Sequence, residues 1–153
     1  KKLDNETITS IALDEMLSYI TKNSSIQTVV FLGDDLFYND DDFVIQFLSG
    51  LKNTRRDVSL MLKTNTLVHL PMRFTQTLMK EIKKTIPKQI ITRCNHSNEV
   101  TADFIYAART LIENGVKIVN YFESNDRVIF HTLKNQLDTI GIGCNTYFAR
   151  TNY

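Results

Sequence analysis

The side chains best suited to chemistry lie in one short segment, residues 93–101, which reads Arg-Cys-Asn-His-Ser-Asn-Glu-Val-Thr. It combines amide, imidazole, carboxylate and hydroxyl groups that donate and accept hydrogen bonds. An apolar run ends just before it at Ile91, and a helical pattern follows from Phe104 to Ile112. A polar segment between a strand and a helix lies at the carboxyl end of a parallel strand, where α/β proteins bind ligands. Asn95 and His96 are therefore candidate binding residues.

Four other polar segments follow apolar runs in the same way: Gly33-Asp34-Asp35, Lys63-Thr64-Asn65, Asn120-Tyr121 and Arg150-Thr151-Asn152. If the apolar runs are parallel strands, these segments gather on one face and form a cleft for a polar ligand. We predict that five residues line a single mouth of a curved parallel sheet: Gly33, Asp34, Asn95, His96 and Asn120.

Each segment also has a purely structural interpretation. Gly33-Asp34 can be a turn, His96 can enter a helix with its ring hydrogen-bonded to the backbone, and Asn98-Glu99 can be capping residues. The acidic run at residues 40–42 is typical of a helix start, where the helix dipole favours negative charge, rather than of a metal site. We assign no catalytic residue and no metal ligand, because the chain shows no Ser-His-Asp or Cys-His order and no glycine-rich phosphate loop.

The elements that would position these segments recur about every thirty residues, the length of a βα unit. Apolar runs at residues 28–32, 58–62, 88–92, 116–119 and 146–149 are typical of strands buried on both faces, and segments with helical spacing lie between them. Thr75 and Thr101 are candidate N-caps, Gly115 is a candidate C-cap, and we expect Gly50 to interrupt the second helix. The pattern predicts an α/β chain with a parallel sheet, forming a single domain over residues 1–153.

Composition limits the classes of function. The chain has 153 residues, 42% of them hydrophobic, and a net charge of +1, which gives no electrostatic reason to expect binding to nucleic acid or to a membrane surface. No apolar stretch is long enough to cross a bilayer. Two cysteines, Cys94 and Cys144, favour a cytoplasmic, reducing compartment and cannot form a four-cysteine zinc or iron–sulfur site by themselves.

Several segments, in this order, resemble the lysine 2,3-aminomutase family of radical SAM enzymes. Residues 29–36 (VVFLGDDL) resemble the family's LSGGDPL, and residues 62–75 (LKTNTLVHLPMRFT) are similar to RIxxRxPVVxPxRIT. Residues 95–101 (NHSNEVT) resemble NHPNEIT, and residues 114–126 contain counterparts of AGIPLxNQ and GVND. Residues 145–148 (NTYF) lie where the family has RPYYLY.

The resemblance implies a partial (β/α) barrel and an isomerase that moves an amino group. It implies S-adenosylmethionine, a [4Fe–4S] cluster and pyridoxal phosphate as cofactors, which carry the radical chemistry while the protein positions them. By their matched positions, Gly33, Asp34, Asn95 and His96 would bind S-adenosylmethionine. Asp126 would hold the distal ammonium of a lysine substrate.

The sequence departs from the family in ways that bear on activity. The CxxxCxxC cluster motif is absent from the chain, and the resemblance places it before Lys1 and the pyridoxal-phosphate lysine after Tyr153. The family arginine of RxP is Asn65, the glutamine of NQ is Tyr121, and an aspartate after the last strand is Asn152. We expect this chain alone to be inactive.

Three interpretations remain open. The chain can be the central part of a longer radical SAM aminomutase that acts on an amino acid or on a lysyl group of a protein. It can instead be a diverged, inactive barrel that serves as a binding or assembly module, or an unrelated α/β binding domain. Because a five-stranded piece of barrel leaves strand edges unpaired, we expect it to pair with the remainder of a longer chain or to form a homo-oligomer.

Overall fold

The computed structural model describes residues 10–32, 35–85 and 89–146. Five short strands form one parallel sheet in the order of the sequence: β1 (Thr28–Phe31), β2 (Ser59–Lys63), β3 (Gln89–Thr92), β4 (Lys117–Phe122) and β5 (Gly143–Thr146). Every pair of neighbouring strands is parallel. The predicted α/β architecture is therefore confirmed.

Helices connect the strands, beginning with α1 (Ser10–Lys22) before β1. The longer ones are α2 (Asp41–Thr54), α4 (Gln76–Thr85), α5 (Ala102–Glu113) and α6 (Arg127–Asp138). Short helical turns lie in the connections: η1 (Leu36–Tyr38), α3 (Thr66–His69), η2 (Pro71–Arg73) and η3 (Ser97–Glu99). No helix in the described ranges is long and apolar enough to cross a membrane.

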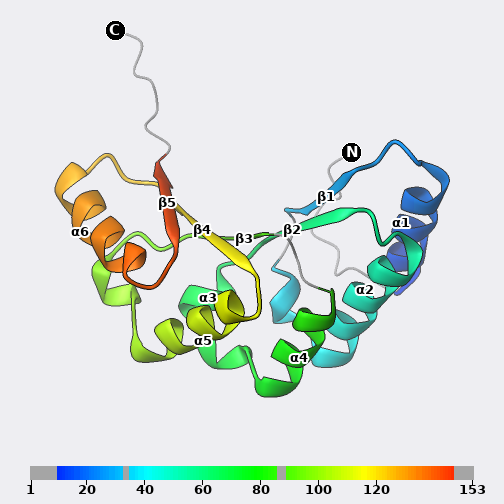
Figure 1. Ribbon diagram of the computed structural model, residues 1–153, viewed down its shortest axis with the longest axis horizontal. Coiled ribbons are helices and arrows are strands. Elements are labelled where there is room, and N and C mark those ends of the chain that lie inside the picture. The colour runs from blue at the N-terminus through cyan, green and yellow to red at the C-terminus, as the bar shows by residue number, and fades with distance from the viewer. Residues whose placement is uncertain (1–9, 33–34, 86–88, 147–153) are drawn as a thin grey trace, which may run out of the picture.

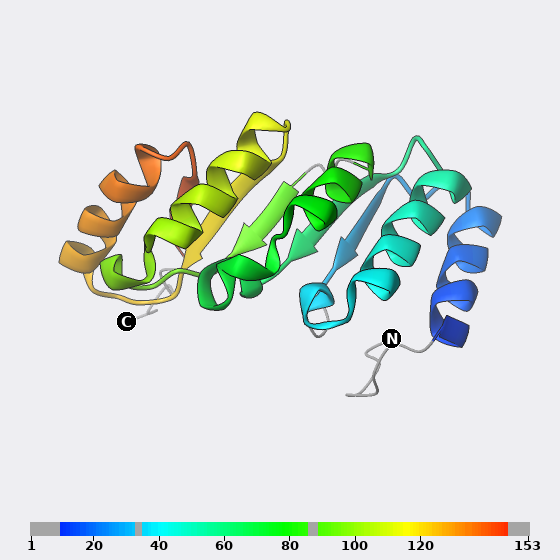
Figure 2. The same ribbon diagram turned by 90° about the horizontal axis from the view of Figure 1, so that it is seen from below.

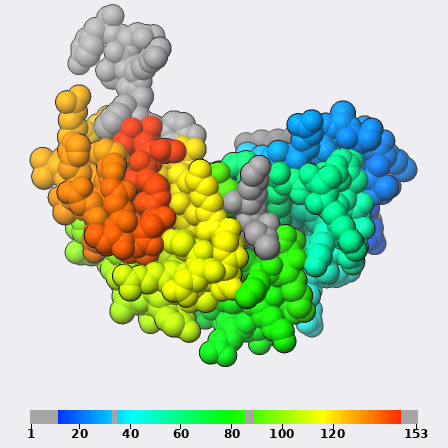
Figure 3. All heavy atoms as spheres, in the orientation of Figure 1, coloured from blue at the N-terminus to red at the C-terminus, as the bar shows by residue number. Residues whose placement is uncertain are grey.

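The helices cover one face of the sheet, as Figure 2 shows, and the sheet bows so that they lie on its convex side (Figure 1). Sequential parallel strands with all helices on one face form part of a (β/α) barrel. The other face of the sheet is concave, and the molecule is hollowed between its two ends in the space-filling view (Figure 3). This arrangement leaves the carboxyl ends of the strands around an open mouth.

The hydrophobic core lies between the sheet and the helices. Leu62, Ile90 and Ile118 are paired across β2, β3 and β4 and are almost fully buried. Since side chains alternate between the two faces of a strand, the residues between these core positions face the concave side. By the same alternation, Val30 on β1 and Leu32 just after it face the concave side. Both are apolar and exposed, at 43% and 64%.

Local signals for the helix boundaries were mostly correct. The side chains of Asp40 and Thr101 accept hydrogen bonds from the N–H groups of Phe43 and Phe104 as N-caps. Thr75 accepts from Leu78 N at 3.2 Å. These contacts form between residues three apart, so the local sequence suffices to predict them.

Two expectations about element boundaries were wrong. Gly50 does not interrupt the second helix, because α2 continues to Thr54. A β-carbon at Gly50 would lie 2.8 Å from the Leu17 side chain, so this glycine lets α1 pack closely against α2. The last strand begins at Gly143, three residues before the predicted start, directly after the turn at Gly141 with φ +90°. The sequence pattern missed the start of this strand because glycine, which lies at its start, is depleted in β-strands.

Candidate functional site at the carboxyl edge of the sheet

The sequence-predicted residues that the structure describes lie at one edge of the sheet. Asn95 and His96 follow β3, Asn120 is near the end of β4, and Asp126 follows β4 at the start of α6. Because the strands are parallel, these positions share the carboxyl edge. Gly33 and Asp34 lie outside the described residues. The shared edge agrees with the prediction, and the binding roles of these residues stay predictions.

The connection after β3 is held by its own glutamate. Glu99 Oε2 accepts hydrogen bonds from the backbone N–H groups of Asn95 at 2.6 Å and His96 at 3.0 Å. His96 Nδ1 in turn accepts from Asn98 N at 3.2 Å, which completes a capping box. The structural interpretation of His96 and Glu99 is thus correct. With Nδ1 as acceptor, the neutral imidazole carries its proton on Nε2, and the residue is exposed.

Asn95 joins the connections after β3 and β4. Its side-chain Oδ1 accepts a hydrogen bond from Glu123 N at 3.0 Å, which fixes the orientation of the amide. Its amide NH₂ group is a donor at the carboxyl edge. Arg93 and Glu123 form an ion pair of 2.8 Å across the same two connections. The β3 and β4 connections are therefore tied together twice.

Asn120 does not line the mouth, contrary to our expectation. Its side chain is completely buried, and its amide pairs with the main chain of Cys94. Oδ1 accepts from Cys94 N at 2.6 Å, and Nδ2 donates to Cys94 O at 2.9 Å. Buried main-chain N–H and C=O groups that do not pair with a neighbouring strand need such hydrogen bonds. Asn120 is consequently a positioning residue that fixes where the β3 connection begins.

Asp35, for which the sequence predicts no individual role, holds the connection after β2. Its carboxylate accepts hydrogen bonds from Thr64 Oγ1 at 2.7 Å and from the backbone N–H groups of Asn65 at 2.6 Å and Thr66 at 2.9 Å. It also caps η1 by accepting from Phe37 N at 3.2 Å. The carboxylate therefore joins the connections after β1 and β2.

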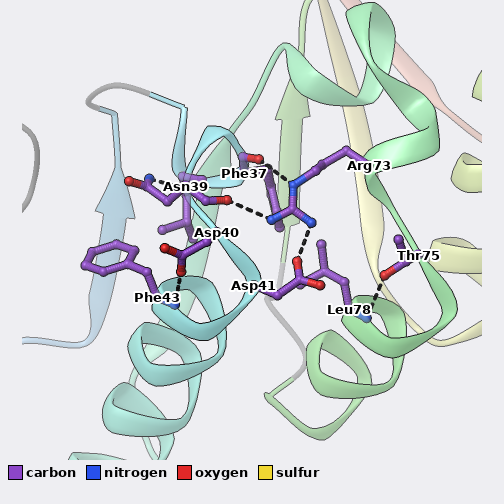
Figure 4. Close-up of polar contacts among 9 residues, drawn as sticks. Phe37, Asn39, Asp40, Asp41, Phe43, Arg73, Thr75 and Leu78 are labelled. Atoms are coloured by element: carbon purple, nitrogen blue, oxygen red, sulfur yellow. Dashed lines mark hydrogen bonds and ion pairs between the residues drawn. The ribbon is translucent and has the colours of Figure 1, made fainter.

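Arg73 also holds the connection after β1, as Figure 4 shows. Its guanidinium donates to Phe37 O at 3.0 Å and Asn39 O at 2.7 Å, and it forms an ion pair with Asp41 at the start of α2. The residue belongs to the family-like segment 62–75, but the three acceptors lie more than thirty positions earlier. No signal in the sequence identifies these acceptors.

Asp126 caps α6. Its Oδ1 accepts hydrogen bonds from Val128 N at 2.9 Å and Ile129 N at 3.0 Å, and the residue is exposed. A helix N-cap of this kind is a common structural use of aspartate. The geometry gives this carboxylate a role in the fold, and its predicted role toward a substrate ammonium stays a prediction.

The two cysteines are free thiols in environments that disfavour the thiolate. Burial, together with the nearby carboxylate of Glu99, raises the pKa of Cys94 to about 12. Burial also raises the pKa of Cys144. No group of three or more His, Cys, Asp or Glu side chains within the described ranges could hold a metal ion.

The helical layer contains a separate cavity. It has a volume of about 600 Å³ and lies between α4 and α5, where Phe74, Met79 and Tyr106 contribute to its lining. These residues are distinct from the candidate residues at the carboxyl edge.

The chain is similar in sequence to several known aminomutases. The chain is 31% identical over 130 residues to glutamate 2,3-aminomutase from Clostridioides difficile, over 82% of this chain and 31% of that protein. It is 27% identical over 108 residues to L-lysine 2,3-aminomutase from Clostridium subterminale, over 71% of this chain and 26% of that protein. The Haemophilus influenzae L-lysine 2,3-aminomutase is 28% identical over 134 residues, or 82% of this chain and 39% of that protein.

The chain is therefore lysine 2,3-aminomutase-like in sequence over 71–82% of its length. It spans no more than 39% of the length of these three relatives. No family model matches the chain. Among solved structures, the intracellular xylanase from Thermoanaerobacterium saccharolyticum aligns with 89% of this chain and 53% of its own, with a TM-score of 0.49 and 14% identity. That likeness is too weak to bear on function.

Proposed function

We propose that this lysine 2,3-aminomutase-like chain forms the central part of the barrel of a radical SAM amino-acid 2,3-aminomutase. In this proposal its carboxyl edge binds S-adenosylmethionine, and other parts of a longer protein supply the cluster cysteines and the pyridoxal-phosphate lysine. The substrate is an amino acid or a lysyl group of a protein. We place the protein in the cytoplasm, where its two cysteines would remain free thiols.

The observation that carries the proposal is the geometry of the NHSNEVT connection. Glu99 fixes the main chain of Asn95 and His96, and the Asn95 side chain is oriented by Glu123 N. Fixed side chains that offer donors at the carboxyl edge suit a polar ligand, because little conformational entropy is lost when it binds. Homology to glutamate and lysine 2,3-aminomutases supports the choice of ligand.

The described residues fit the three implied cofactors to different degrees. The Asn95 amide and the exposed His96 ring fit S-adenosylmethionine, since both can donate hydrogen bonds to its carboxylate or ribose oxygens. That cofactor supplies a radical that abstracts hydrogen when a reduced cluster is also bound. The described residues do not fit the cluster, because Cys94 and Cys144 are buried or half-buried and no metal-binding group surrounds them. In this proposal, no described residue holds pyridoxal phosphate.

Binding of S-adenosylmethionine to the isolated chain tests the proposal. Titration of the ¹⁵N-labelled chain, followed by NMR, should shift the amides of residues 93–101. His96→Asn keeps a capping acceptor and removes the imidazole, so it should weaken binding about tenfold. The exposed His131, on α6, is the matched control, and His131→Asn should bind like the unmodified chain. Absence of saturable shifts in residues 93–101 would reject the proposal.

A second candidate function is a binding or assembly module without catalysis. It is favoured by the use of Asp126, Asn120 and Glu99 as caps and ties for the main chain. It is favoured also by Asn65 in place of the family arginine. The same titration separates the two functions, because a module that has lost the cofactor site would leave residues 93–101 unshifted.

We also propose that the sheet is completed by further strands, from a longer chain or from a second copy. Among the described strands, β1 and β5 each pair on one side only. The exposed side chains of Val30 and Leu32 lie beside the β1 edge, and an apolar surface next to an open strand edge favours association. Light scattering of the isolated chain across a concentration series should show a mass above that of the 17.7 kDa monomer. A monomeric mass throughout would exclude the second copy.

A further inference from the structure

The concave face carries two neighbouring cations near its carboxyl edge. On β2, Leu60 and Leu62 are buried in the core, so Lys63 faces the concave side. After β3, Arg93 lies between the buried residues Thr92 and Cys94 and therefore faces the same side. Both strands run in the same direction, which places both cations at the mouth.

The register brings these cations together. Lys63 pairs with Ile91, and Arg93 lies two residues further along the same chain segment. A strand spacing of about 4.8 Å and a rise of about 3.3 Å per residue put the two α-carbons about 8 Å apart. Side chains as long as lysine and arginine can reach one group between them.

Of the two cations, Arg93 has a described counter-charge, and Lys63 has none in the described ion pairs. Arg93 binds Glu123 at 2.8 Å in an ion pair whose side chains are 39% and 44% exposed. Lys63 is exposed and takes part in none of the salt bridges found over residues 10–32, 35–85 and 89–146. Asp35 and Glu99 also lie near this edge, but main-chain N–H groups surround their carboxylates and offset their charge.

We propose that Lys63 and Arg93 form an anion-binding pair that holds a side-chain carboxylate of the substrate, so that the preferred substrate is an acidic amino acid. This inference rests on the proposed function for the location of the substrate and adds its class. A distal ammonium would meet two cations here. The carboxylate predicted to hold such an ammonium, Asp126, instead caps α6. The pair is a specificity-determining element of the concave face.

Two simple probes of opposite charge test the proposal on the isolated chain. Glutarate carries two carboxylates on a short alkyl chain, and cadaverine carries two ammonium groups on a similar one. In ¹⁵N NMR titrations, glutarate should shift the amides around Lys63 and Arg93 saturably, and cadaverine should leave them in place. Equal shifts with cadaverine, or none with glutarate, would overturn the assignment.

Charge-neutralising variants locate the site. Lys63→Gln and Arg93→Gln should each weaken glutarate binding about tenfold, since each removes one charge-assisted contact. Lys117→Gln is the matched control, because Lys117 begins β4 at the opposite end of the sheet and is exposed. Its affinity for glutarate should equal that of the unmodified chain. An equal loss in Lys117→Gln would indicate nonspecific attraction and refute the site.

Glu123→Gln gives a change in the opposite direction. It removes the carboxylate that competes for Arg93 and leaves the backbone N–H of residue 123 free to bind Asn95 as before. Glutarate should therefore bind several-fold more tightly to this variant, and weaker binding would contradict the proposal. The same samples are titrated with S-adenosylmethionine. Binding of that cofactor without binding of glutarate rejects the anion pair alone, whereas binding of neither rejects the proposed function as well.

Discussion

Asn120 and Thr92 occupy paired positions on neighbouring strands, and their substitutions should affect stability very differently. Both are almost fully buried, at 0% and 2% exposure. Asn120 satisfies both backbone groups of Cys94, at 2.6 and 2.9 Å. Thr92 Oγ1 has no hydrogen-bond partner within the described part of the chain. Asn120 is thus a buried polar side chain with hydrogen-bond partners, and Thr92 is one whose hydroxyl has none in the described residues.

Asn120→Ala should lower the free energy of unfolding by about 2–5 kcal/mol. It leaves the N–H and C=O of the buried Cys94 without partners, and each such group costs about 1–3 kcal/mol. Thr92→Val has nearly the same shape and removes a hydroxyl that is buried without a partner. Its free energy of unfolding should be unchanged or raised by up to about 1 kcal/mol.

Urea unfolding followed by circular dichroism measures both values, provided that the dependence of the free energy on urea concentration stays constant among the variants. Hydrogen exchange at the Cys94 amide supplies an independent measurement, and it should be accelerated in Asn120→Ala. A loss of less than about 1 kcal/mol of unfolding free energy in Asn120→Ala, or an equal loss in Thr92→Val, would refute this role of Asn120.

Three further predictions concern the remaining contacts. Arg73→Met should lower the free energy of unfolding by about 2–3 kcal/mol, because it leaves two carbonyls and one carboxylate without their donor. Arg73→Lys should recover only part of the lost free energy, and urea unfolding measures both variants. The hydrogen bond from Arg55 lowers the pKa of Asp57 to about 2, so its stabilising contribution is full above the unfolded pKa near 3.8 and is lost as the pH falls through about 2. Unfolding curves of Asp57→Asn and the unmodified chain should therefore differ at pH 6 and converge near pH 2, and a constant difference would contradict this. Burial raises the pKa of Cys94 to about 12, so iodoacetamide should alkylate Cys94 slowly at pH 8 and faster as the pH rises. The half-buried Cys144 should be alkylated first. Peptide mass spectrometry measures the order of modification, and faster alkylation of Cys94 would contradict the prediction.

Local sequence patterns were sufficient to predict the repeated βα units, the parallel sheet and most helix boundaries. These features depend on contacts between residues a few positions apart, such as Asp40 with Phe43, and on the apolar period of each element. The position of the candidate connection at the carboxyl edge also followed, because in parallel strands every carboxyl end points the same way.

Packing in the folded chain selects which polar side chains stay available to bind a ligand. Asn120 had the right type and position for the mouth, yet it bonds to Cys94, 26 residues earlier. Arg73 likewise meets Phe37, 36 residues away. Such pairs form because packing of the sheet against its helices buries main-chain groups that must find partners. The side chain that bonds to each main-chain group is set by distances in the folded chain. Patterns among neighbouring residues in the sequence do not reveal these distances.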